Sequence, residues 1–488
     1  MKTIKLSFIA LFLILSSQFE TMAFCGFYVA KADATLFNKS SQVIIVRDGD
    51  KSVITMSNDF QGEVKDFAMV IPVPEVLLRQ NIRIANQSIF DKLDAYSGPR
   101  LVEYYDENPC YKFEWEEMSM ADMAPMASGS GARRMSKSAK KNKVTIEASY
   151  TVGEYDILIL SAKESNGLKT WLIENNYKIP NGAEEVLDPY IKNDLKFFVV
   201  KVNLENQKKM GFNTLRPIQI AFHSDKFMLP IRLGMANADG AQDLVIYSFT
   251  KKGRVESVNY RTVEIPTDKN IPEFVQKDFG KFYVDLFDKA YERENKKAVF
   301  LEYAWDVSFN NSVKCDPCVG PPPVYNDLRE AGVYWLNNNG GINVEGEVFF
   351  TRMHVRYDRK NFPQDLFFQE TPNKKKFQGR YVMQHAVKGN LECDDANAYF
   401  KKVTKRREKE LHQLANLTGW DISDRYDYVR EFANKVKKND NGWIEPDFKK
   451  GSLGDFDGLA LKDLMIYVFL ILFIGGLNAF WIRSTRSV

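Results

Sequence analysis

Histidine is scarce in this chain, and catalytic signature motifs are absent. Four histidines occur in 488 residues, and they are far apart: His223, His354, His385 and His412. A metal site or a catalytic triad built on histidine is therefore hard to assemble. The sequence also lacks a metalloprotease helix motif, a serine nucleophile elbow and a phosphate-binding loop. We predict no catalytic residues, no metal ion and no cofactor, and the sequence favours a protein that is not an enzyme.

An excess of charge of one sign is lacking as well. The 67 lysine and arginine residues nearly balance the 64 aspartate and glutamate residues, for a net charge of +3. Such a small net charge does not favour nucleic acid as a partner. Hydrophobic residues make up 44% of the chain and aromatic residues 13%. This composition argues against disorder in the body of the chain and predicts a large folded core.

The longest apolar runs stand near the two ends of the chain. Residues 1–23 combine two early lysines, an apolar run and a small-residue end, which are the three parts of a secretory signal peptide. We expect cleavage after Ala23. Acylation of Cys25 is the alternative, but lipoprotein processing needs a small residue before the cysteine, and Phe24 is large.

The second run, residues 464–482, contains no ionisable side chain. At about 1.5 Å per residue a helix there spans roughly 28 Å, close to the thickness of the bilayer core. Tyr467 and Trp481 lie near its ends, where aromatic rings favour the membrane interface. Because a cleaved signal commits the chain to export, we expect residues 483–488 in the cytoplasm and the large N-terminal part in the periplasm or outside the cell. The predicted location is the cell membrane, with a single span.

Strand-like and helix-like patterns alternate through the exported part. Apolar runs at residues 43–46 and 53–56 flank an Asp-Gly step, which is typical of a β-hairpin. Together the patterns predict a mixed α+β fold with largely antiparallel sheets, packed helices and one C-terminal transmembrane helix. The first predicted region is an α+β region at 24–262, which contains a disordered insertion at 117–143 that is rich in Met, Ser and basic residues. A second α+β region at 263–438 ends in two helices, and a spacer follows at 439–463.

Five cysteines in an exported chain favour disulfide bonds, although their number is odd. We expect Cys25 to pair with Cys110. We also expect Cys315 to pair with Cys318, which leaves Cys393 over, and the alternative joins Cys393 to Cys315 or Cys318. Thiols at this spacing also occur in thiol–disulfide oxidoreductases, at the start of a helix that lowers the thiol pKa. Because three prolines follow closely here, a structural disulfide is favoured over redox activity or a metal site.

A row of cationic side chains follows later in the sequence. Arg352, His354 and Arg356 alternate with uncharged residues, so a strand there turns all three side chains to one face. Neighbours on that face stand roughly 7 Å apart, which suits phosphate or carboxylate groups of glycans or lipids. The other interpretation is the solvated face of a half-buried strand.

Several short segments match a known bacterial family. They are Cys25-Gly26-Phe27-Tyr28, Leu36-Phe37-Asn38-Lys39, Arg47-Asp48-Gly49, the stretch from Tyr150 to Asp156, Cys315-Asp316-Pro317-Cys318, His354-Val355-Arg356-Tyr357 and Phe377-Gln378-Gly379-Arg380-Tyr381. Through these segments, most of residues 25–420 resembles the secreted bacterial proteins grouped as domain of unknown function 2330. The resemblance implies a bacterial envelope protein, often with a C-terminal membrane segment, and it carries over no activity and no catalytic residue.

These observations favour an exported, membrane-anchored protein whose ectodomain binds or scaffolds an unknown protein or glycan of the bacterial envelope. One alternative is a membrane-tethered thiol–disulfide oxidoreductase that uses Cys315 and Cys318. Another alternative is a binder of anionic glycans or lipid headgroups through Arg352, His354 and Arg356.

Overall fold

The structure, a computed structural model, describes residues 27–30, 37–38, 41–57, 60–61, 67–111, 144–163, 165–175, 183–203, 205–206, 215–236, 240–338 and 344–436. Outside the described residues lie the predicted signal peptide at 1–23, insertion at 117–143, spacer at 439–463, transmembrane helix at 464–482 and tail at 483–488. Among the described helices, none is both long and apolar enough to cross a membrane. The described part has a mixed α+β fold, as predicted.

The chain divides into two compact units. The first comprises Met1–Asn108, Lys112–Lys388 and His412–Trp420, and the second comprises Pro109–Tyr111, Gly389–Leu411 and Asp421–Val488. All of the described strands belong to the first unit.

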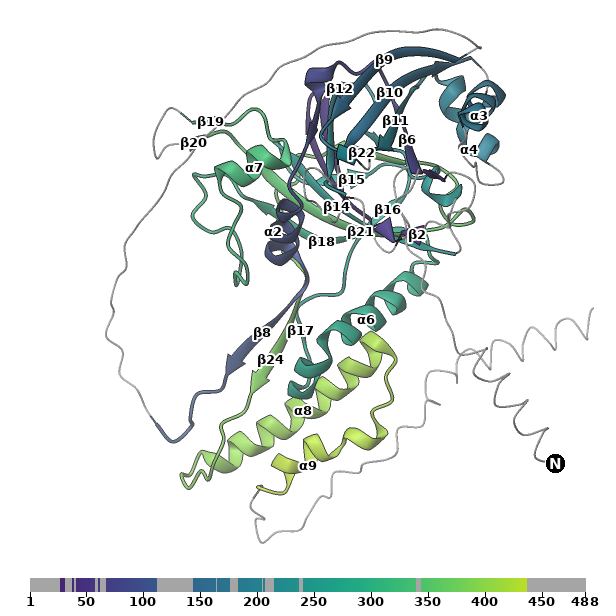
Figure 1. Cartoon of the computed structure of the whole chain (residues 1–488). Helices are drawn as coiled ribbons and strands as arrows, with labels where there is room; N and C mark the ends of the chain where they lie inside the picture. The colour runs from purple at the N-terminus through teal and green to yellow at the C-terminus, as the bar shows by residue number, and fades with distance from the viewer. Residues whose placement is uncertain are drawn as a thin grey trace, which may run out of the picture. The chain divides into compact units, whose positions relative to one another are not determined.

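A nine-stranded sheet forms the centre of the first unit (Figure 1). Its strands lie in the order β16 (Arg261–Glu264), β18 (Ala298–Asp306), β21 (Phe349–Tyr357), β14 (Gln242–Thr250), β3 (Ser41–Asp48), β4 (Lys51–Ser57), β12 (Ile218–His223) and β7 (Ile82–Ile84), and β23 (Phe377–Gln378) pairs with β18. β14 is parallel to β3 and β16 is parallel to β18, whereas the other pairs are antiparallel. The sequence predicts a boundary between two α+β regions at residues 262 and 263. β14 lies before this boundary and β21 after it, and the two strands pair along their whole length, so the boundary falls inside the first unit.

The predicted β-hairpin supplies two strands of this sheet. β3 and β4 pair around a turn at Gly49, whose φ of +59° favours glycine. Along β3, Val43 and Ile45 join one core cluster, and Ile44 and Val46 join another. Because alternate side chains of a strand point to opposite faces, the sheet is buried on both faces here.

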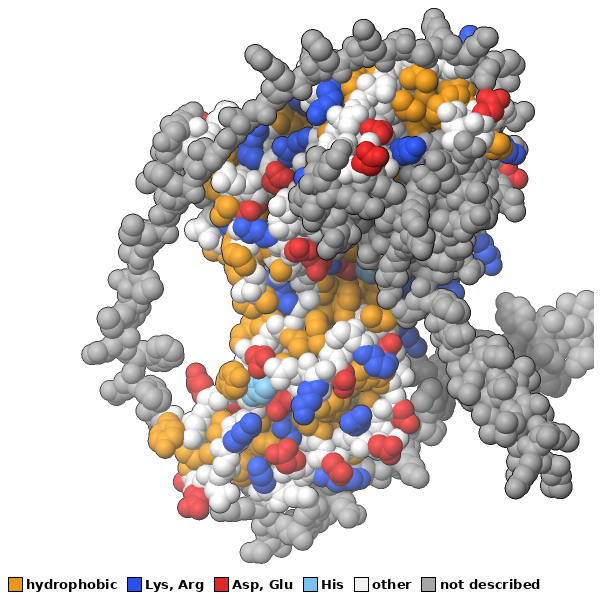
Figure 2. Space-filling model, viewed as in Figure 1, with side chains coloured by type: hydrophobic (Ala, Val, Ile, Leu, Met, Phe, Trp, Pro, Cys, Tyr) orange, Lys and Arg blue, Asp and Glu red, His pale blue; other side chains and the backbone are white. Residues whose placement is uncertain are grey.

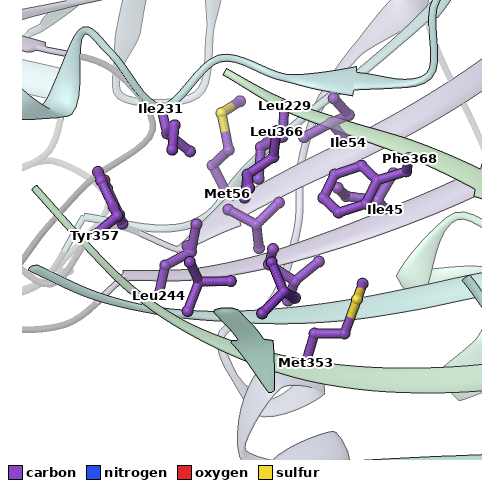
Figure 3. Packing of buried hydrophobic residues seen from close by; sticks show 14 of the residues in the cluster. Ile45, Ile54, Met56, Leu229, Ile231, Leu244, Met353, Tyr357, Leu366 and Phe368 are labelled. Atoms are coloured by element: carbon purple, nitrogen blue, oxygen red, sulfur yellow. The ribbon is translucent and has the colours of Figure 1, made fainter. Parts of the chain in front are cut away.

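A five-stranded antiparallel sheet packs on one face of the nine-stranded sheet. Its strands lie in the order β1 (Phe27–Ala30), β6 (Phe67–Val73), β11 (Lys196–Val202), β10 (Tyr155–Ala162) and β9 (Val144–Val152). Ile157 and Ile159 of β10 share a core cluster with Val43 and Ile45, and Figure 3 shows part of this cluster. On its other face the five-stranded sheet packs against α3 (Ser165–Glu174) and α4 (Ala183–Lys192).

Other helices and small sheets complete the first unit. α2 (Ser88–Ser97) and α7 (Tyr325–Ala331) bury Phe90 and Leu328 in the second core cluster, whereas α6 (Phe279–Arg293) buries Phe282 in the first. Two three-stranded sheets have the orders β13 (Met228–Leu229), β22 (Leu366–Glu370), β15 (Val255–Ser257) and β17 (Lys269–Asn270), β24 (Arg380–His385), β8 (Arg100–Tyr105). The remaining elements of this unit are the pairs β2 (Phe37–Asn38) with β5 (Phe60–Gln61) and β19 (Asn337–Asn338) with β20 (Val344–Glu345), and the 3-10 helices η1 (Arg79–Asn81), η2 (Gly234–Ala236) and η3 (Glu273–Asp278). A further 3-10 helix, η4 (Ser423–Arg425), belongs to the second unit.

Two helices near the C-terminus, α8 (Ala396–Thr418) and α9 (Asp427–Ala433), lie where the sequence predicts them. Within the second unit, the rings of Phe400 and Phe432 lie 6.1 Å apart. The guanidinium of Arg407 lies 4.1 Å from the ring centre of Tyr428 and 4.4 Å from that of Phe432. Aromatic and cation–π contacts therefore hold α9 against α8 in this unit.

The turn after α7 generates the first testable prediction. Gly332 ends this helix with a φ of +106°, and a Cβ there would lie 2.7 Å from Cγ1 of the buried Val53. The Gly332→Ala substitution should therefore lower the free energy of unfolding of the full-length protein by about 2 kcal/mol or more, measured by chemical denaturation.

Gly280→Ala is the matched control. Gly280 is exposed in the first turn of α6, and a Cβ there meets nothing within 4 Å. Since alanine is the better helix former, this change should leave stability equal or raise it by up to about 1 kcal/mol. Equal effects of the two substitutions would contradict the described packing of Gly332.

Candidate functional site

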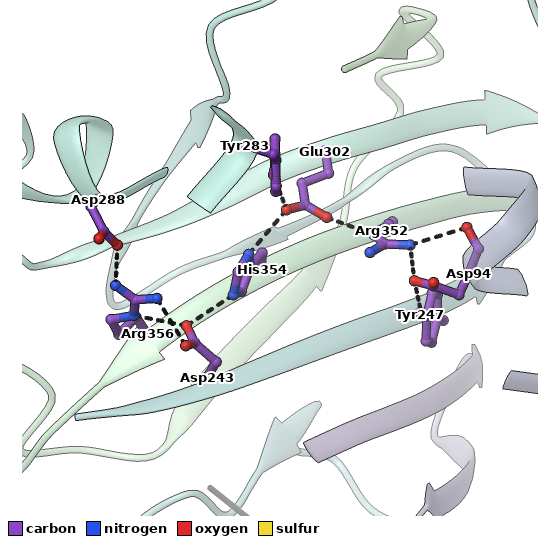
Figure 4. Close-up of polar contacts among 9 residues, drawn as sticks. All are labelled: Asp94, Asp243, Tyr247, Tyr283, Asp288, Glu302, Arg352, His354 and Arg356. Carbon is purple, nitrogen blue, oxygen red and sulfur yellow. Dashed lines mark hydrogen bonds and ion pairs between the residues drawn. The ribbon is translucent and has the colours of Figure 1, made fainter. Parts of the chain in front are cut away.

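A seam of charged side chains runs along β18, β21 and β14, on the face that carries α2 and α6 (Figure 4). Its centre is Glu302 of β18, whose side chain is buried. The pairing of β18 with β21 is irregular between Leu301 and Tyr303, and these two residues belong to opposite core clusters. Glu302 thus occupies a β-bulge, a device that redirects side chains.

Residues of β21 and α6 surround the Glu302 carboxylate. Arg352 Nε donates a hydrogen bond to Glu302 Oε2 at 2.6 Å, and His354 Nδ1 lies 3.0 Å from Oε1. Tyr283 of α6 donates its hydroxyl to the same carboxylate. Burial of a carboxylate without partners would cost several kcal/mol of folding free energy. These three contacts offset that cost and allow Glu302 to be buried.

The seam extends from Glu302 in both directions. His354 Nε2 lies 3.0 Å from Asp243 Oδ1, and Arg356 makes two hydrogen bonds of 2.9 Å to the same carboxylate. Arg356 also donates to Asp288 of α6. At the other end, Arg352 Nη1 donates to Asp94 of α2 at 2.7 Å. The three cationic side chains therefore share four carboxylates.

These contacts shift the pKa values of the seam. Burial alone would lower the pKa of His354, but its hydrogen bonds to Asp243 and Glu302 outweigh burial and raise the pKa to about 9. Burial alone would raise the pKa of Glu302, but the Arg352 charge and the His354 hydrogen bond lower it to about 2. Likewise, against the effect of burial, His354 and Arg356 lower the pKa of Asp243. His354 is therefore a cation and both acids are anions at neutral pH.

The sequence correctly predicts that Arg352, His354 and Arg356 share one face of a strand. Their partners, which come from four other elements of the fold, could not be read from the local pattern. Binding of an external anion to this row stays a prediction, and the pairing argues against it, since each cation already contacts at least one carboxylate. On the face drawn in Figure 2, positive and negative side chains of the described residues are interspersed.

One of the two observed disulfide bonds was predicted from the sequence, and the other was not. Cys315 and Cys318 are bonded, as predicted. The expected bond between Cys25 and Cys110 is wrong, because Cys110 pairs with Cys393, and the alternative partners of Cys393 are therefore wrong too. Cys25 lies outside the described residues.

Topology explains the second disulfide. The strands β8 and β24 are parallel neighbours that end at Tyr105 and His385. The segments that lead to Cys110 and Cys393 therefore start side by side, although the two cysteines are 283 residues apart in the sequence. No local sequence motif predicts such a pairing.

The Cys315–Cys318 bond lies in a non-helical loop. Cys315 packs in the second core cluster and is 7% exposed, and α7 begins only at Tyr325. The helix start that lowers a thiol pKa in oxidoreductases is therefore missing at this pair. Among the described residues, no group of three or more His, Cys, Asp or Glu side chains is placed to hold a metal ion.

A second candidate site is a cavity of about 270 Å³ in the first unit. Three sheets line it: the nine-stranded sheet, the five-stranded sheet and the sheet of β13, β22 and β15. Its apolar lining includes Ile54, Met56, Ile71, Ile220, Phe222, Met228, Leu229 and Phe367. Sequence reasoning missed this cavity, since its walls come from strands far apart in the chain.

A small polar cluster interrupts the apolar lining. Tyr190 of α4 donates its hydroxyl to Asp365 Oδ1 at 2.6 Å, and the backbone amide of Arg232 donates to the same oxygen at 3.1 Å. Asp365 is 4% exposed, and this burial raises its pKa and outweighs the lowering effect of these donors. Arg232 Nε lies 3.8 Å from Asp365 Oδ2 and makes no hydrogen bond, although it is buried.

Comparison with known proteins identifies one family. The family described as "Uncharacterized protein conserved in bacteria (DUF2330)" matches the chain over residues 20–369, which confirms the resemblance seen in the sequence. No curated protein matches the chain, and no solved structure does. The matched range includes both the charged seam and the residues that line the cavity.

The charged seam predicts a pH dependence of stability. A group whose pKa is raised on folding stabilises the protein below its unfolded pKa and loses that contribution as pH rises through the folded pKa. For His354 this interval runs from 6.5 to about 9. The free energy of unfolding should fall by roughly 2–3 kcal/mol more over this interval in the wild type than in the His354→Gln variant, measured by denaturant titration at each pH.

The His223→Gln variant is the control. The side chain of His223 is 56% exposed and lies outside the seam, so this variant should keep the fall in stability that the seam produces. A His354→Gln variant with the wild-type slope would contradict the assignment of a buried imidazolium.

Proposed function

The chain belongs to the DUF2330 family of uncharacterized bacterial proteins, and from this premise we propose that it is an exported envelope protein whose folded part binds another envelope component. In this proposal residues 464–482 anchor the protein in the cell membrane, with the folded part outside the cytoplasm and residues 483–488 inside. The bound component is a small molecule, or a protein or glycan that presents an apolar group. The proposal assigns the chain no catalysis.

The single observation that carries the binding role is the cavity where the three sheets meet. Ligand sites are commonly concave and mostly apolar, with a few polar groups that converge on one point. The cavity is concave and most of its lining is apolar, and its polar groups come from Tyr190, Asn193, Ser224, Asp225, Lys226, Arg232 and Asp365. Asn193, Asp225 and Lys226 of the lining are exposed, so the cavity is accessible from the solvent.

The disulfides support the proposed location. Four of the five cysteines form two bonds, Cys110–Cys393 and Cys315–Cys318. Such bonds persist in the bacterial periplasm and on cell surfaces and are rare in the reducing cytosol. The chain is therefore expected to fold after export.

The two alternative functions gain no support from the geometry. Cys315 packs in a core cluster in a non-helical loop, which suits a structural disulfide better than a redox centre. Arg352, His354 and Arg356 would have to give up their carboxylate partners to bind an anionic glycan or a lipid headgroup.

Filling the cavity tests the proposal. Met228 lines the cavity on β13, and the Met228→Trp substitution should occupy part of its volume. Native mass spectrometry of the full-length protein from bacterial membranes should detect a co-purified small molecule or captured group on the wild type. The Met228→Trp variant should carry at most about a tenth of that adduct, the loss expected when roughly 1.4 kcal/mol of binding free energy is removed.

Val258→Trp is the control, because Val258 is exposed and does not line the cavity. This variant should keep the adduct. A wild type without any adduct, or a Met228→Trp variant with an undiminished one, would count against a binding role for the cavity.

A further inference from the structure

A smaller pocket, of about 160 Å³, lies beside the turn that follows α7 in the first unit. Val53 of β4 and Ala221 of β12 line it, whereas the next residues along the same strands, Ile54 and Phe222, line the larger cavity. Because alternate side chains of a strand point to opposite faces, the two sites lie on opposite faces of the nine-stranded sheet. The smaller pocket is therefore a separate site.

We propose that this pocket binds a phosphate group, either free phosphate or the terminal phosphate of an envelope component. The inference goes beyond the proposed function and does not rest on it. Three features of the pocket carry it: cations without acids in the wall, arginines and a lysine with unused donors, and a matching size and charge.

The wall of the pocket carries charge of one sign. Of the ten described residues that line it, three are cations and none is an acid. The cations are Lys51 of β4, Arg83 of β7 and Arg329 of α7, which the fold brings together from distant parts of the sequence. The other polar lining residues are Gln80, Asn81, Gln219 and Tyr334. Such a wall favours an anion over a neutral or cationic ligand.

Lys51 has no carboxylate partner among the described residues. Asp48 and Asp50 lie beside it in the hairpin, but both pair with other basic side chains. Lys51 Nζ instead lies 4.1 Å from the ring centre of Tyr334. Because a cation–π contact uses no hydrogen-bond acceptor, it leaves the N–H donors of Lys51 available to a ligand.

Arg83 and Arg329 use only part of their donors within the protein. Arg83 Nη2 donates to the backbone oxygens of Arg329 and Glu330 at 3.1 and 2.6 Å. Arg329 Nη1 donates to the backbone oxygens of Val333 and Tyr334 at 3.2 and 2.7 Å. The other nitrogens of both guanidinium groups make no hydrogen bond to the described residues. The backbone contacts thus fix the position of both groups and leave donors for a ligand.

The two guanidinium groups also lie close enough to repel each other. Partial burial lowers the pKa of Arg83, and the charge of Arg329 lowers it further, against the raising effect of Glu330. Glu330 Oε2 is 3.6 Å from Arg83 Nη2 and offsets one of the three positive charges. An anion between the arginines would remove the remaining repulsion.

Charge and volume match a phosphate group. Three cations and Glu330 leave a local net charge of +2, and a phosphate monoester carries close to two negative charges at neutral pH. A volume of about 160 Å³ has room for about five non-hydrogen atoms at roughly 30 Å³ each, the number in a phosphate group. Guanidinium forks bind phosphate oxygens through paired hydrogen bonds, and a lysine adds a point charge. A single carboxylate would leave one positive charge unmatched.

Calorimetric titration of the full-length protein in a non-ionic detergent tests the inference with inorganic phosphate, glycerol 3-phosphate and glycerol. Both phosphates should bind the wild type, and glycerol should not. The Lys51→Gln variant should bind both phosphates at least tenfold more weakly, because it loses a charge-assisted contact. Tighter binding of glycerol 3-phosphate would identify an esterified phosphate as the ligand, and tighter binding of inorganic phosphate would identify the free ion.

Arg329→Gln is a second variant with the same expected loss. Since Arg329 also bonds to the backbone, thermal unfolding first checks that this variant is folded. Lys192→Gln is the matched control, because Lys192 is exposed at the end of α4, pairs with Asp188 and does not line the pocket. It should bind both phosphates like the wild type, which separates a specific contact from the overall charge.

Three results would overturn the inference: no binding of either phosphate at about 10 mM, wild-type affinity in the Lys51→Gln variant, or glycerol that binds as tightly as glycerol 3-phosphate. The outcome is independent of the Met228→Trp experiment, because that substitution lies on the other face of the sheet. Failure of the cavity proposal would therefore leave the phosphate site standing, and the reverse also holds.

Discussion

The burial of one carboxylate, that of Glu302, is the constraint on which the central sheet depends. A buried anion is tolerated only where cations and hydrogen-bond donors surround it. The bulge in β18 turns Glu302 toward Arg352 and His354 of β21, and Tyr283 of α6 closes over it. Removal of any one of these partners would leave the Glu302 carboxylate incompletely paired in a low-dielectric interior. The seam therefore requires β18, β21 and α6 to pack together in this arrangement.

This internal neutralisation also decides where binding can occur. A row of two arginines and a histidine on one strand is attractive as an anion site when only the sequence is considered. In the folded chain the same row contributes to stability, because its charges are matched by Glu302, Asp243, Asp94 and Asp288. The cavity between the sheets differs from the seam, because most of its lining is apolar. The cations that stabilise the central sheet therefore lie apart from the cavity at which binding is proposed.

Local patterns in the sequence predicted local features well. The Asp-Gly step gave the hairpin at Gly49, period-two alternation gave the shared face of β21, and close spacing gave the Cys315–Cys318 bond. Non-local features were missed for a common physical reason. The Cys110–Cys393 bond, the pairing of β14 with β21 across residue 262 and the convergence of three sheets on the cavity all depend on topology. No propensity or periodicity within a short window encodes which distant strands become neighbours.

The central claim is that His354 is charged at neutral pH as part of the fold, and is not a site for external anions. Nitrogen NMR of the full-length protein with labelled histidine tests it most directly, with the His354 resonances assigned from the His354→Gln variant. At about pH 7.5 both ring nitrogens should have the chemical shifts of an imidazolium, because the pKa of His354 is raised to about 9. Addition of a sulfated glycan should leave these shifts unchanged. A neutral ring at this pH, or shifts that move when the glycan is added, would contradict the account.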